Sequence, residues 1–437
     1  MAWNFETDPD FQRKLDWMSD FVRTEVEPLD LVFTHPADPF DPARKGPAAA
    51  MAPLKKRVQE QALWACHLGP ELGGQGYGQV KLGLMNEILG RSRFASTVFG
   101  CQAPDTGNSE ILARFGTPEQ KKRYLEPLLA GTIASCYSMT EPQAGADPAQ
   151  FTTRAELVGD HWVINGEKWF ASHADFSKFL LVVVITNPDV PVHEGASILI
   201  VDRDAPGLEL VRNVAVGMRE EMGSGVHAYL RFTNCRVPRE NILGRPGQGF
   251  EVAQSRLGGG RIHHAMRTVG VLNRALDMMC ERALSRTTKG ELLSKKQMTQ
   301  EKIADSYTQI TQFRLHVLYA AWLIDKHQAY NREVRREIAA VKAAMPGVLR
   351  DVVYRALHLH GSLGMSNETP LMQMWATVPE MGIVDGPTEV HKISVAKEVL
   401  RDRRGAQQLW PNYYLPDAID KARQKLAWAL ELDIGNR

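Results

Sequence analysis

Two kinds of hydrophobic periodicity divide the chain into three regions. Apolar residues recur at a helical spacing up to about residue 133, alternate in short β-type segments up to about residue 247, and return to the helical spacing from Gly249 onward. This order predicts an α+β protein. We place its domains at residues 1–133 (N-terminal, helical), 134–247 (middle, β) and 248–404 (C-terminal helical bundle), with a helical tail at 405–437.

The N-terminal region has several helix signals. Its spacing predicts helices over residues 8 to about 33, around 54–63, near 80–88 and over 109–115. Pro28 is expected to end the first helix, and the proline-rich residues 36–53 to form a loop. Thr117 followed by Pro118 predicts a helix start, with the threonine as N-cap.

The middle region predicts short strands, bounded by Gly, Pro, Asn or Asp, over residues 151–157, 162–164, 179–186, 196–201, 208–211 and 228–232. Asn165-Gly166 has the composition of a type I′ hairpin turn. In the last region, three apolar stripes predict long helices around residues 269–283, 303–324 and 338–352. Pro346 is expected to kink or break the third of them. Another helix is expected over 385–404, and one amphipathic helix in the tail.

Composition excludes several classes of protein. The 437 residues include 52 Lys and Arg against 51 Asp and Glu, so no overall charge favours nucleic acid or an anionic membrane. Five scattered cysteines argue against a disulfide framework or zinc site and for a reducing compartment. No signal peptide or membrane-length apolar run is seen. We expect a soluble, cytoplasmic protein.

Residues 137–147 lie where the helical pattern gives way to the β pattern. Their sequence, YSMTEPQAGAD, combines an aromatic, two hydroxyls, a proline and small residues. This composition is typical of an irregular segment that presents backbone N–H groups to a planar or anionic partner. An ordinary surface loop has the same composition, so both interpretations stay open at this point.

Three ordered motifs, at residues 137–142, 164–172 and 235–244, resemble the acyl-CoA dehydrogenase family. The resemblance covers about residues 8–404. The stretches RLGGGRIHHAMRTVG at 256–270 and DGPTEVHK at 385–392 are most similar to the branch formed by family members ten and eleven. The resemblance implies a helical domain, a middle β domain of barrel or sandwich type, and a C-terminal four-helix bundle.

The resemblance also implies ligands and partners. FAD is expected between the β domain and the bundle, with part of its site contributed by a neighbouring subunit of a homodimer or homotetramer. The substrate is expected to be an acyl-CoA, and the electron acceptor an electron-transferring flavoprotein. A cofactor site of this kind needs no dinucleotide-binding glycine motif.

The resemblance assigns cofactor residues by position. Thr140 is expected at the pyrimidine edge of the flavin, Phe170 at the place usually held by a tryptophan, and Ser172 near the reactive N5. Arg286 is expected to reach the pyrophosphate of a neighbouring subunit, a role suited to a guanidinium. The cofactor-binding residues are, in full, Tyr137, Ser138, Met139, Thr140, Phe170, Ser172, Arg286, Gln297, His358, Gly361, Ser362 and Glu389.

Asp385 is the candidate base. The family's catalytic position is usually a glutamate, and the base removes the proton α to the thioester while flavin N5 takes the β-hydride. Some branches place the base at the position of Gly260, which cannot serve here. The resemblance assigns substrate contacts to Ala146, Gly258, Arg261 and Gly386.

Three positions depart from the family pattern. Ala146 replaces a serine, His358 a glutamine and Ser362 a glycine. The His358-x-His360 pair has no carboxylates beside it, so no metal is expected. Two alternatives to the dehydrogenase stay open: a flavin oxidase of the same fold resembling nitroalkane oxidase, and a catalytically silent family member.

Overall fold

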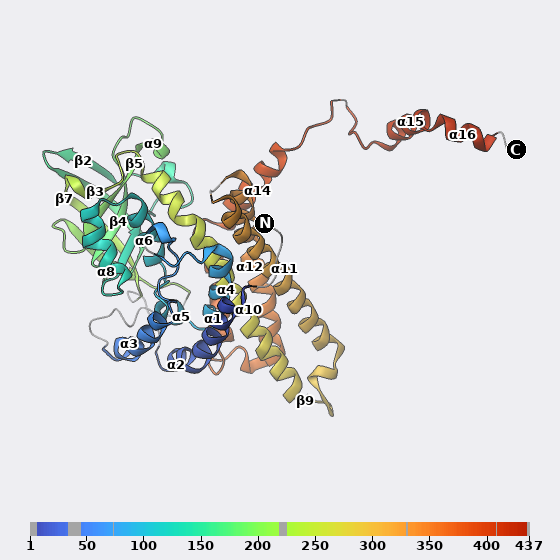
Figure 1. Ribbon diagram of the computed structural model, residues 1–437, viewed down its shortest axis with the longest axis horizontal. Helices are drawn as coiled ribbons and strands as arrows, with labels where there is room; N and C mark the ends of the chain where they lie inside the picture. Colours follow the sequence, from blue (N-terminus) through green and yellow to red (C-terminus); the bar gives the residue numbers. More distant parts are fainter. Residues whose placement is uncertain are drawn as a thin grey trace. The chain divides into compact units, whose positions relative to one another are not determined.

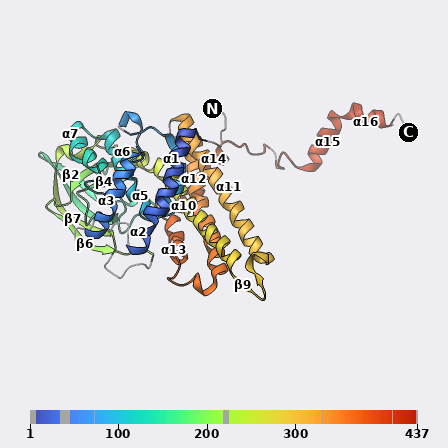
Figure 2. The same cartoon turned by 60° about the horizontal axis from the view of Figure 1, so that its bottom comes forward.

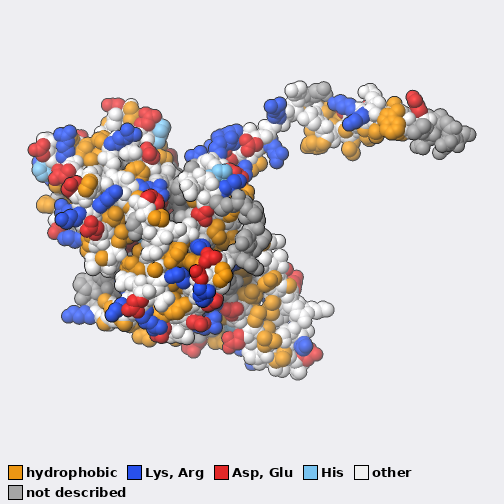
Figure 3. Space-filling model, viewed as in Figure 1, with side chains coloured by type: hydrophobic (Ala, Val, Ile, Leu, Met, Phe, Trp, Pro, Cys, Tyr) orange, Lys and Arg blue, Asp and Glu red, His pale blue; other side chains and the backbone are white. Residues whose placement is uncertain are grey.

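The computed structural model describes residues 7–33, 45–72, 74–217, 225–328, 331–407 and 409–434, without the side chains of residues 257–259 and 432–434. The chain forms two compact units, Met1–Lys392 and Ile393–Arg437. All the candidate site residues lie in the first unit. Figure 3 shows acidic and basic side chains interspersed over the visible face, as expected from the nearly balanced charge.

The first helical segment consists of α1 (Pro9–Phe21), a π-helical turn at Val22–Val26 and α2 (Glu27–Val32). Its buried face includes Phe11, Leu15 and Met18. The prediction that Pro28 ends this helix was wrong, because Pro28 lies in the first turn of α2, where no intrahelical N–H donor is required. The wider π turn that precedes it allows the chain to continue.

The next helix, α3 (Lys45–Glu60), begins earlier than predicted and contains Pro53. The predicted loop over 36–53 was therefore wrong from residue 45 onward, and its first part lies outside the described residues. The remaining helices of this region are η3 (Pro70–Leu72), α4 (Gly78–Leu89), α5 (Ala95–Val98), α6 (Asp105–Phe115), α7 (Pro118–Gln120), η4 (Lys121–Leu125) and α8 (Glu126–Leu129).

The predicted start at Thr117 is confirmed as a capping box. The Thr117 hydroxyl accepts from the Gln120 N–H at 3.2 Å, and the Thr117 N–H donates to the Gln120 side-chain oxygen at 3.1 Å. The side-chain Nε2 of Gln120 also donates to the backbone carbonyls of Glu240 and Ile242. The cap thus connects the helical region to the β region.

Replacing the cap residue, Thr117→Ala, is expected to lower the free energy of unfolding by about 1 kcal/mol, because the Gln120 N–H loses its acceptor. Denaturant unfolding of the purified protein measures this change. Thr24→Ala is the matched control, since the exposed Thr24 hydroxyl only donates to the Asp20 carbonyl within a helix. Equal unfolding free energies for Thr117→Ala and the control would contradict the prediction.

The middle region is one mixed sheet, visible in Figure 1. Its path runs β6-β7-β3-β2-β4-β5-β8, and β1 pairs in parallel with β4. The strands are β1 (Ser135–Ser138), β2 (Arg154–Val158), β3 (His161–Ser172), β4 (Phe179–Ile185), β5 (Ala196–Asp202), β6 (Leu208–Val214), β7 (His227–Pro238) and β8 (Ile242–Leu243), with the short helices η5 (Pro148–Gln150), α9 (Val192–Gly195) and η6 (Arg239–Asn241) between them. Strand β4 is buried along its whole length.

The predicted hairpin at Asn165-Gly166 was wrong. Both residues lie inside β3, which pairs antiparallel with β7 and shifts register between Ile164 and Gly166. Gly166 has φ 140°, and a Cβ there would lie 2.6 Å from the Cα of Thr153. The glycine therefore serves a β-bulge and a close backbone approach.

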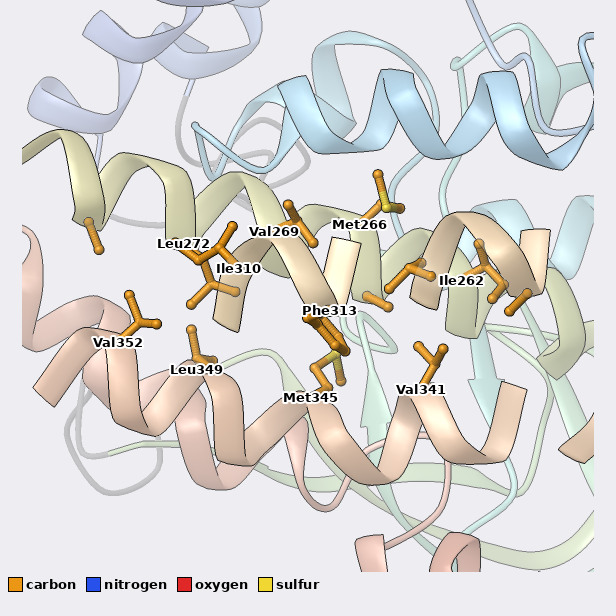
Figure 4. Packing of buried hydrophobic residues seen from close by; sticks show 14 of the residues in the cluster. Ile262, Met266, Val269, Leu272, Ile310, Phe313, Val341, Met345, Leu349 and Val352 are labelled. Atoms are coloured by element: carbon orange, nitrogen blue, oxygen red, sulfur yellow. The ribbon is translucent and has the colours of Figure 1, made fainter. Parts of the chain in front are cut away.

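The C-terminal region is built on three long helices, α10 (Gly249–Ser285), α11 (Gln297–His327) and α12 (Arg332–His360). Figures 1 and 2 show them side by side. Figure 4 shows part of their core, whose buried residues include Val269 of α10, Phe313 of α11 and Met345 of α12. A hairpin of β9 (Thr287–Thr288) and β10 (Glu291–Leu292), followed by η7 (Leu293–Lys295), joins α10 to α11.

The helix α12 continues through Pro346, so a break at that residue was a wrong prediction. After α12 come η8 (Gly361–Leu363), α13 (Leu371–Met381), which was not predicted, and α14 (Thr388–Arg401). Asp385 therefore precedes its helix, three residues outside the observed start. In the tail, α15 (Leu415–Lys425) and α16 (Ala427–Ile434) replace the single expected helix.

Two further sequence expectations concern the whole chain. All five cysteines are free thiols, and Cys66, Cys136 and Cys235 are buried. Over the described residues, no helix combines the length and apolar character that a bilayer span requires.

Candidate active site

Asp385 occupies the turn between α13 and α14. Its φ is 56°, a left-handed conformation that aspartate tolerates, and Gly386 follows with φ 100°. The Asp385 carbonyl accepts from Arg261 Nε at 3.2 Å, and His391 Nε2 lies 3.2 Å from the same oxygen. A Cβ at Gly386 would lie 3.0 Å from His391 Nε2, so the turn is packed against this histidine. The backbone of the candidate base is therefore fixed on two sides.

The charge state of Asp385 is set by cations around it. Burial raises its pKa, but the contact with His264, followed by the positive charges of Arg256, Arg261 and Lys342, outweighs burial and holds the pKa below its ordinary value. The carboxylate Oδ2 lies 3.7 Å from His264 Nε2, and 22% of the Asp385 side chain is exposed. At neutral pH the group is thus an ionised carboxylate, the form that a base requires.

His264 itself is neutral at that pH. Burial and the nearby Arg267 lower the pKa of the imidazole to about 3. The permanent positive charges that lower the pKa of Asp385 most are therefore Arg256 and Arg261 of α10 and Lys342 of α12. Lys342 Nζ donates to the Met381 carbonyl at 2.6 Å. Burial lowers the pKa of this lysine to about 8, so it remains charged at neutral pH.

Glu141 organises the segment 137–147. It forms a fully buried ion pair with Lys168 of β3, whose Nζ lies 2.9 Å from Oε1. The Glu141 carboxylate also accepts from the N–H groups of Thr152 at 2.7 Å and Thr153 at 3.1 Å. Lys168 Nζ donates in addition to the Met139 carbonyl at 2.8 Å, and so fixes the backbone of the segment.

Sequence reasoning assigned no role to this pair. The available signal was a pair of opposite charges, Glu141 and Lys168, in two of the motifs that carry the family resemblance. Burial opposes ionisation, but the contact with Lys168 and the hydrogen bonds lower the pKa of Glu141 to about 2. Burial lowers the pKa of Lys168 to about 8. Both members are therefore charged at neutral pH.

The segment lies against the end of β3. The Trp169 N–H donates to the Thr140 carbonyl at 2.8 Å. Phe170 has φ 53° and is 48% exposed, and its ring stacks on Trp169 with centroids 5.3 Å apart. The Ser172 hydroxyl is 2.8 Å from His227 Nδ1. An exposed aromatic ring on a strained backbone is a feature of binding sites.

These residues fit a flat aromatic ligand with polar edges. Phe170 supplies an exposed ring beside the segment that starts at Tyr137. Within the described part of the chain, the buried Ser138 Oγ and Trp169 Nε1 have no hydrogen-bond partner, and buried polar atoms are normally satisfied. A flavin has the ring system and the hydrogen-bonding edge that such a site requires.

Five other predicted cofactor residues belong to segments toward the opposite end of the bundle, the end at which β9 is labelled in Figure 1. Between Arg261 and Arg286, α10 rises by roughly 37 Å. The end of α12 returns to that side, since Arg355 Nη1 donates to Gln309 of α11 at 2.6 Å. The residues found there are Arg286, Gln297, His358, Gly361 and Ser362, all of them exposed. One subunit therefore brings Asp385 and Arg286 to different ends of its bundle.

The three remaining assignments are Ala146, Glu389 and Gly258. Ala146 and Glu389 are exposed, the latter in the first turn of α14. Gly361, with φ 66°, caps α12 by donating to the carbonyls of Leu357 and His358. Gly258 lies in α10, within the residues 257–259 whose surroundings are outside the description. Among the described residues no group of three or more metal-binding side chains occurs.

Comparison with known proteins identifies the family. Models of the N-terminal, middle and C-terminal domains of acyl-CoA dehydrogenases match residues 10–132, 136–235 and 247–400. A probable acyl-CoA dehydrogenase, FadE2, of Mycobacterium tuberculosis is 40% identical over 88% of this chain and 93% of its own length. Acyl-CoA dehydrogenase family member 10 of Mus musculus is 38% identical over 92% of this chain. This chain spans only 38% of the length of that mouse protein.

Solved structures agree with this result. A putative acyl-CoA dehydrogenase from Mycobacterium abscessus superposes with a TM-score of 0.82 at 35% identity, covering 91% of this chain and 99% of the other. The FAD complex of PigA, at 21% identity and a TM-score of 0.76 over 91% of this chain and 99% of the other, shares the fold. The predicted arrangement of a helical, a β and a second helical region is confirmed, and the chain belongs to the acyl-CoA dehydrogenase family of flavoprotein oxidoreductases.

Proposed function

We propose that the protein is an FAD-dependent dehydrogenase that converts an acyl-CoA thioester to the trans-2-enoyl-CoA. The observation that carries this proposal is the carboxylate of Asp385, held on a turn that Arg261 and His391 contact and lying 3.7 Å from His264 Nε2. A carboxylate so placed is suited to remove the weakly acidic proton next to a thioester carbonyl.

The chain's own residues prepare the proton transfer. As the C–H bond at the substrate's α-carbon breaks, the proton moves to the Asp385 carboxylate, and negative charge develops on the thioester oxygen of the substrate. The backbone N–H of Asp385 is proposed to donate to that oxygen, and the cations of α10 and α12 favour the charge. Bound FAD supplies the acceptor for the hydride that leaves Cβ. Arg261 and Gly386 maintain the turn that carries the base, while Gly258 remains a proposed substrate contact.

Two copies of the chain are proposed to complete each cofactor site. Tyr137, Ser138, Met139, Thr140, Phe170 and Ser172 would hold the ring system in one subunit, with Glu389 as a further cofactor residue. The neighbouring subunit would contribute Arg286, Gln297, His358, Gly361 and Ser362. The roughly 37 Å along α10 between Arg261 and Arg286 supports this division.

Exposed apolar side chains near the end of the bundle that carries Arg286 and β9 support the proposal that a partner subunit binds there. They are Leu284, Met298, Tyr307, Tyr354, Leu363 and Met365, each between 39% and 71% exposed. A group of this kind on a protein surface is typical of an interface. A homodimer or homotetramer would cover it.

Arg286→Ala is expected to weaken FAD binding roughly tenfold or more, because a charge-assisted bond to phosphate is lost. The unfolding free energy of the FAD-free protein should not change, since the side chain is exposed. FAD retention on dilution and gel filtration measures the loss. Lys289→Ala, in the exposed hairpin turn nearby, is the control. Wild-type FAD affinity in Arg286→Ala would refute the proposed cross-subunit site.

Anaerobic mixing of the FAD-loaded protein with acyl-CoA thioesters of increasing chain length tests the function. Bleaching of the flavin absorbance by at least one thioester is expected, and the series also identifies the preferred chain. Bleaching by a nitroalkane and by no acyl-CoA would overturn the proposal in favour of an oxidase. A protein that binds no flavin would be a silent member. Reoxidation by an electron-transferring flavoprotein tests the proposed acceptor.

Exposed Ala146 offers no hydroxyl where the family has a serine near the CoA phosphates. We therefore propose that this part of CoA is held by other groups.

A further inference from the structure

We infer that Arg256 is a positioning residue of this active site: its guanidinium, anchored by α6 and β1, holds the Tyr137 ring and supplies part of the positive charge that faces Asp385. This inference rests on the proposed function, because it assigns Arg256 to the preparation of the base. Arg256 lies five residues before Arg261 on α10; it is the first residue of the stretch 256–270, but the resemblance assigned it no role.

A buried series of hydrogen bonds from Asn108 through Ser135 to Asp105 anchors Arg256. Arg256 Nε donates to Asn108 Oδ1 at 3.1 Å, and Asn108 Nδ2 donates to Ser135 Oγ at 2.8 Å. The Ser135 hydroxyl and N–H both donate to Asp105 Oδ1, at 2.5 and 2.8 Å. The side chains of Asn108, Ser135 and Asp105 are buried. Such a fully satisfied network fixes one rotamer of each member.

Arg256 also lies directly over Tyr137. Its guanidinium carbon is 4.0 Å from the centroid of the tyrosine ring, a close cation–π contact. Burial raises the pKa of Tyr137 to about 12, so the ring faces the arginine as a neutral phenol. Tyr137 is the first residue of the segment proposed to lie along the flavin. The arginine therefore connects that segment to α10 and to the helix α6.

The backbone of α6 is shaped to admit the arginine. A Cβ at Gly107 would lie 2.8 Å from Arg256 Cγ and 2.9 Å from Nε. This distance is too short for any real contact, so a side chain at Gly107 would displace the arginine. The glycine, the Asn108 acceptor and the Tyr137 ring thus define one position for the guanidinium.

Several charged or titratable groups act on Asp385 besides Arg256. They are Tyr137 of β1, Arg261, His264 and Arg267 of α10, Lys342 of α12 and His391 of α14. Among these, His264 and His391 are neutral at neutral pH, because burial lowers the pKa of His391 to about 4 as it lowers that of His264. Arg256 is one of the permanent charges.

Two acidic groups face the arginine and its anchor. Glu110 of α6 pairs with Arg114 at 3.2 Å and lies near Arg256, and burial raises its pKa to about 7. Asp105 faces Lys55, and burial raises its pKa to about 6. Below neutral pH, Glu110 is protonated and leaves the Arg256 charge uncompensated. The effect of Arg256 on Asp385 should therefore be clearest on the acid side.

The test is the pH dependence of flavin reduction in the FAD-loaded protein, measured by anaerobic rapid mixing with an acyl-CoA that reduces the wild type. Loss of the cation in Arg256→Gln leaves the proton more tightly bound to Asp385. The pH at which the rate falls to half should therefore rise. Arg256→Lys keeps the charge and should retain the wild-type midpoint. The control Glu110→Gln should also retain it, since Glu110 is already neutral there.

If the pH at which the rate of flavin reduction falls to half (the acid midpoint) is the same in Arg256→Gln as in the wild type, the inference is overturned and the proposed function stays intact. If Arg256→Gln does not hold FAD, Gly107→Ala decides, because its Cβ displaces the guanidinium without removing any charge. A raised midpoint in Gly107→Ala supports the inference, and an unchanged one refutes it. A wild type that no acyl-CoA reduces would overturn the proposed function, and the inference with it.

Discussion

Asp385→Asn is expected to keep FAD bound and to slow flavin reduction by acyl-CoA at least about a hundredfold. Asparagine has the same shape but accepts no proton at its amide. The contacts that hold the turn, from Arg261 Nε and His391 Nε2, involve the backbone carbonyl of residue 385 and survive the change. Cofactor binding and the fold should therefore be unaffected. Anaerobic rapid mixing gives the rate, and the flavin spectrum gives the FAD content.

Asp277→Asn is the matched control, because Asp277 is an exposed carboxylate of α10 that only pairs with Arg91 at the surface. Its rate should equal that of the wild type. A near-normal rate in Asp385→Asn would exclude Asp385 as the base. Loss of FAD from that variant, with the control intact, would make Asp385 a structural residue.

The pH dependence of the wild type follows from the same residue. The contact with His264 and the surrounding cations outweigh burial and hold the pKa of Asp385 below its ordinary value. A base with a lowered pKa stays ionised to lower pH, so the rate should fall only when the solution is acidified past the ordinary range of an aspartate. Steady loss of flavin reduction around neutral pH would contradict this assignment.

Local sequence signals predicted the fold where the physical cause was itself local. Thr117 and Gln120 form their capping box within one turn, so the sequence contains all the partners. The bulge at Gly166 depends on Thr153 and on β7, which are distant in sequence, and Asn-Gly alone favours a hairpin. The prediction that Pro28 ends the first helix was wrong because the π-helical turn at Val22–Val26 lets the helix continue past the proline. The proposed domain boundaries stay predictions.

The candidate site was accessible from sequence only through motif resemblance. Asp385 was assigned by its place in a motif, and its position on a left-handed turn required the structure. Its neighbours Arg256, His264 and Lys342 come from two helices, and no spacing rule relates them to residue 385. The Glu141–Lys168 pair was missed for the same reason. The two residues are distant in sequence and come into contact only because the segment 137–147 packs against β3.

Breaking the buried Glu141–Lys168 pair should have the largest effect on stability. Lys168→Met leaves the Glu141 carboxylate buried without its cation, which is expected to cost about 3–5 kcal/mol of unfolding free energy. The loss also frees the Met139 carbonyl, so FAD retention should fall. The double variant Glu141→Leu/Lys168→Met should lose less than the sum of the single variants. Denaturant unfolding measures all three, and additive losses would contradict a coupled pair.

The acid dependence of stability separates the charge of Glu141 from its packing. Its folded pKa is about 2, against an ordinary value of 4.5. Between these two pKa values the unfolded chain binds more protons than the folded chain. The stabilisation by the Glu141 charge is therefore complete above pH 4.5 and is lost as the pH falls toward about 2. Glu141→Gln should lose this dependence, whereas Glu156→Gln, at an exposed position of β2, should keep it. The same carboxylate accepts from the N–H groups of Thr152 and Thr153, so these hydrogen bonds contribute to the stabilisation that acid removes.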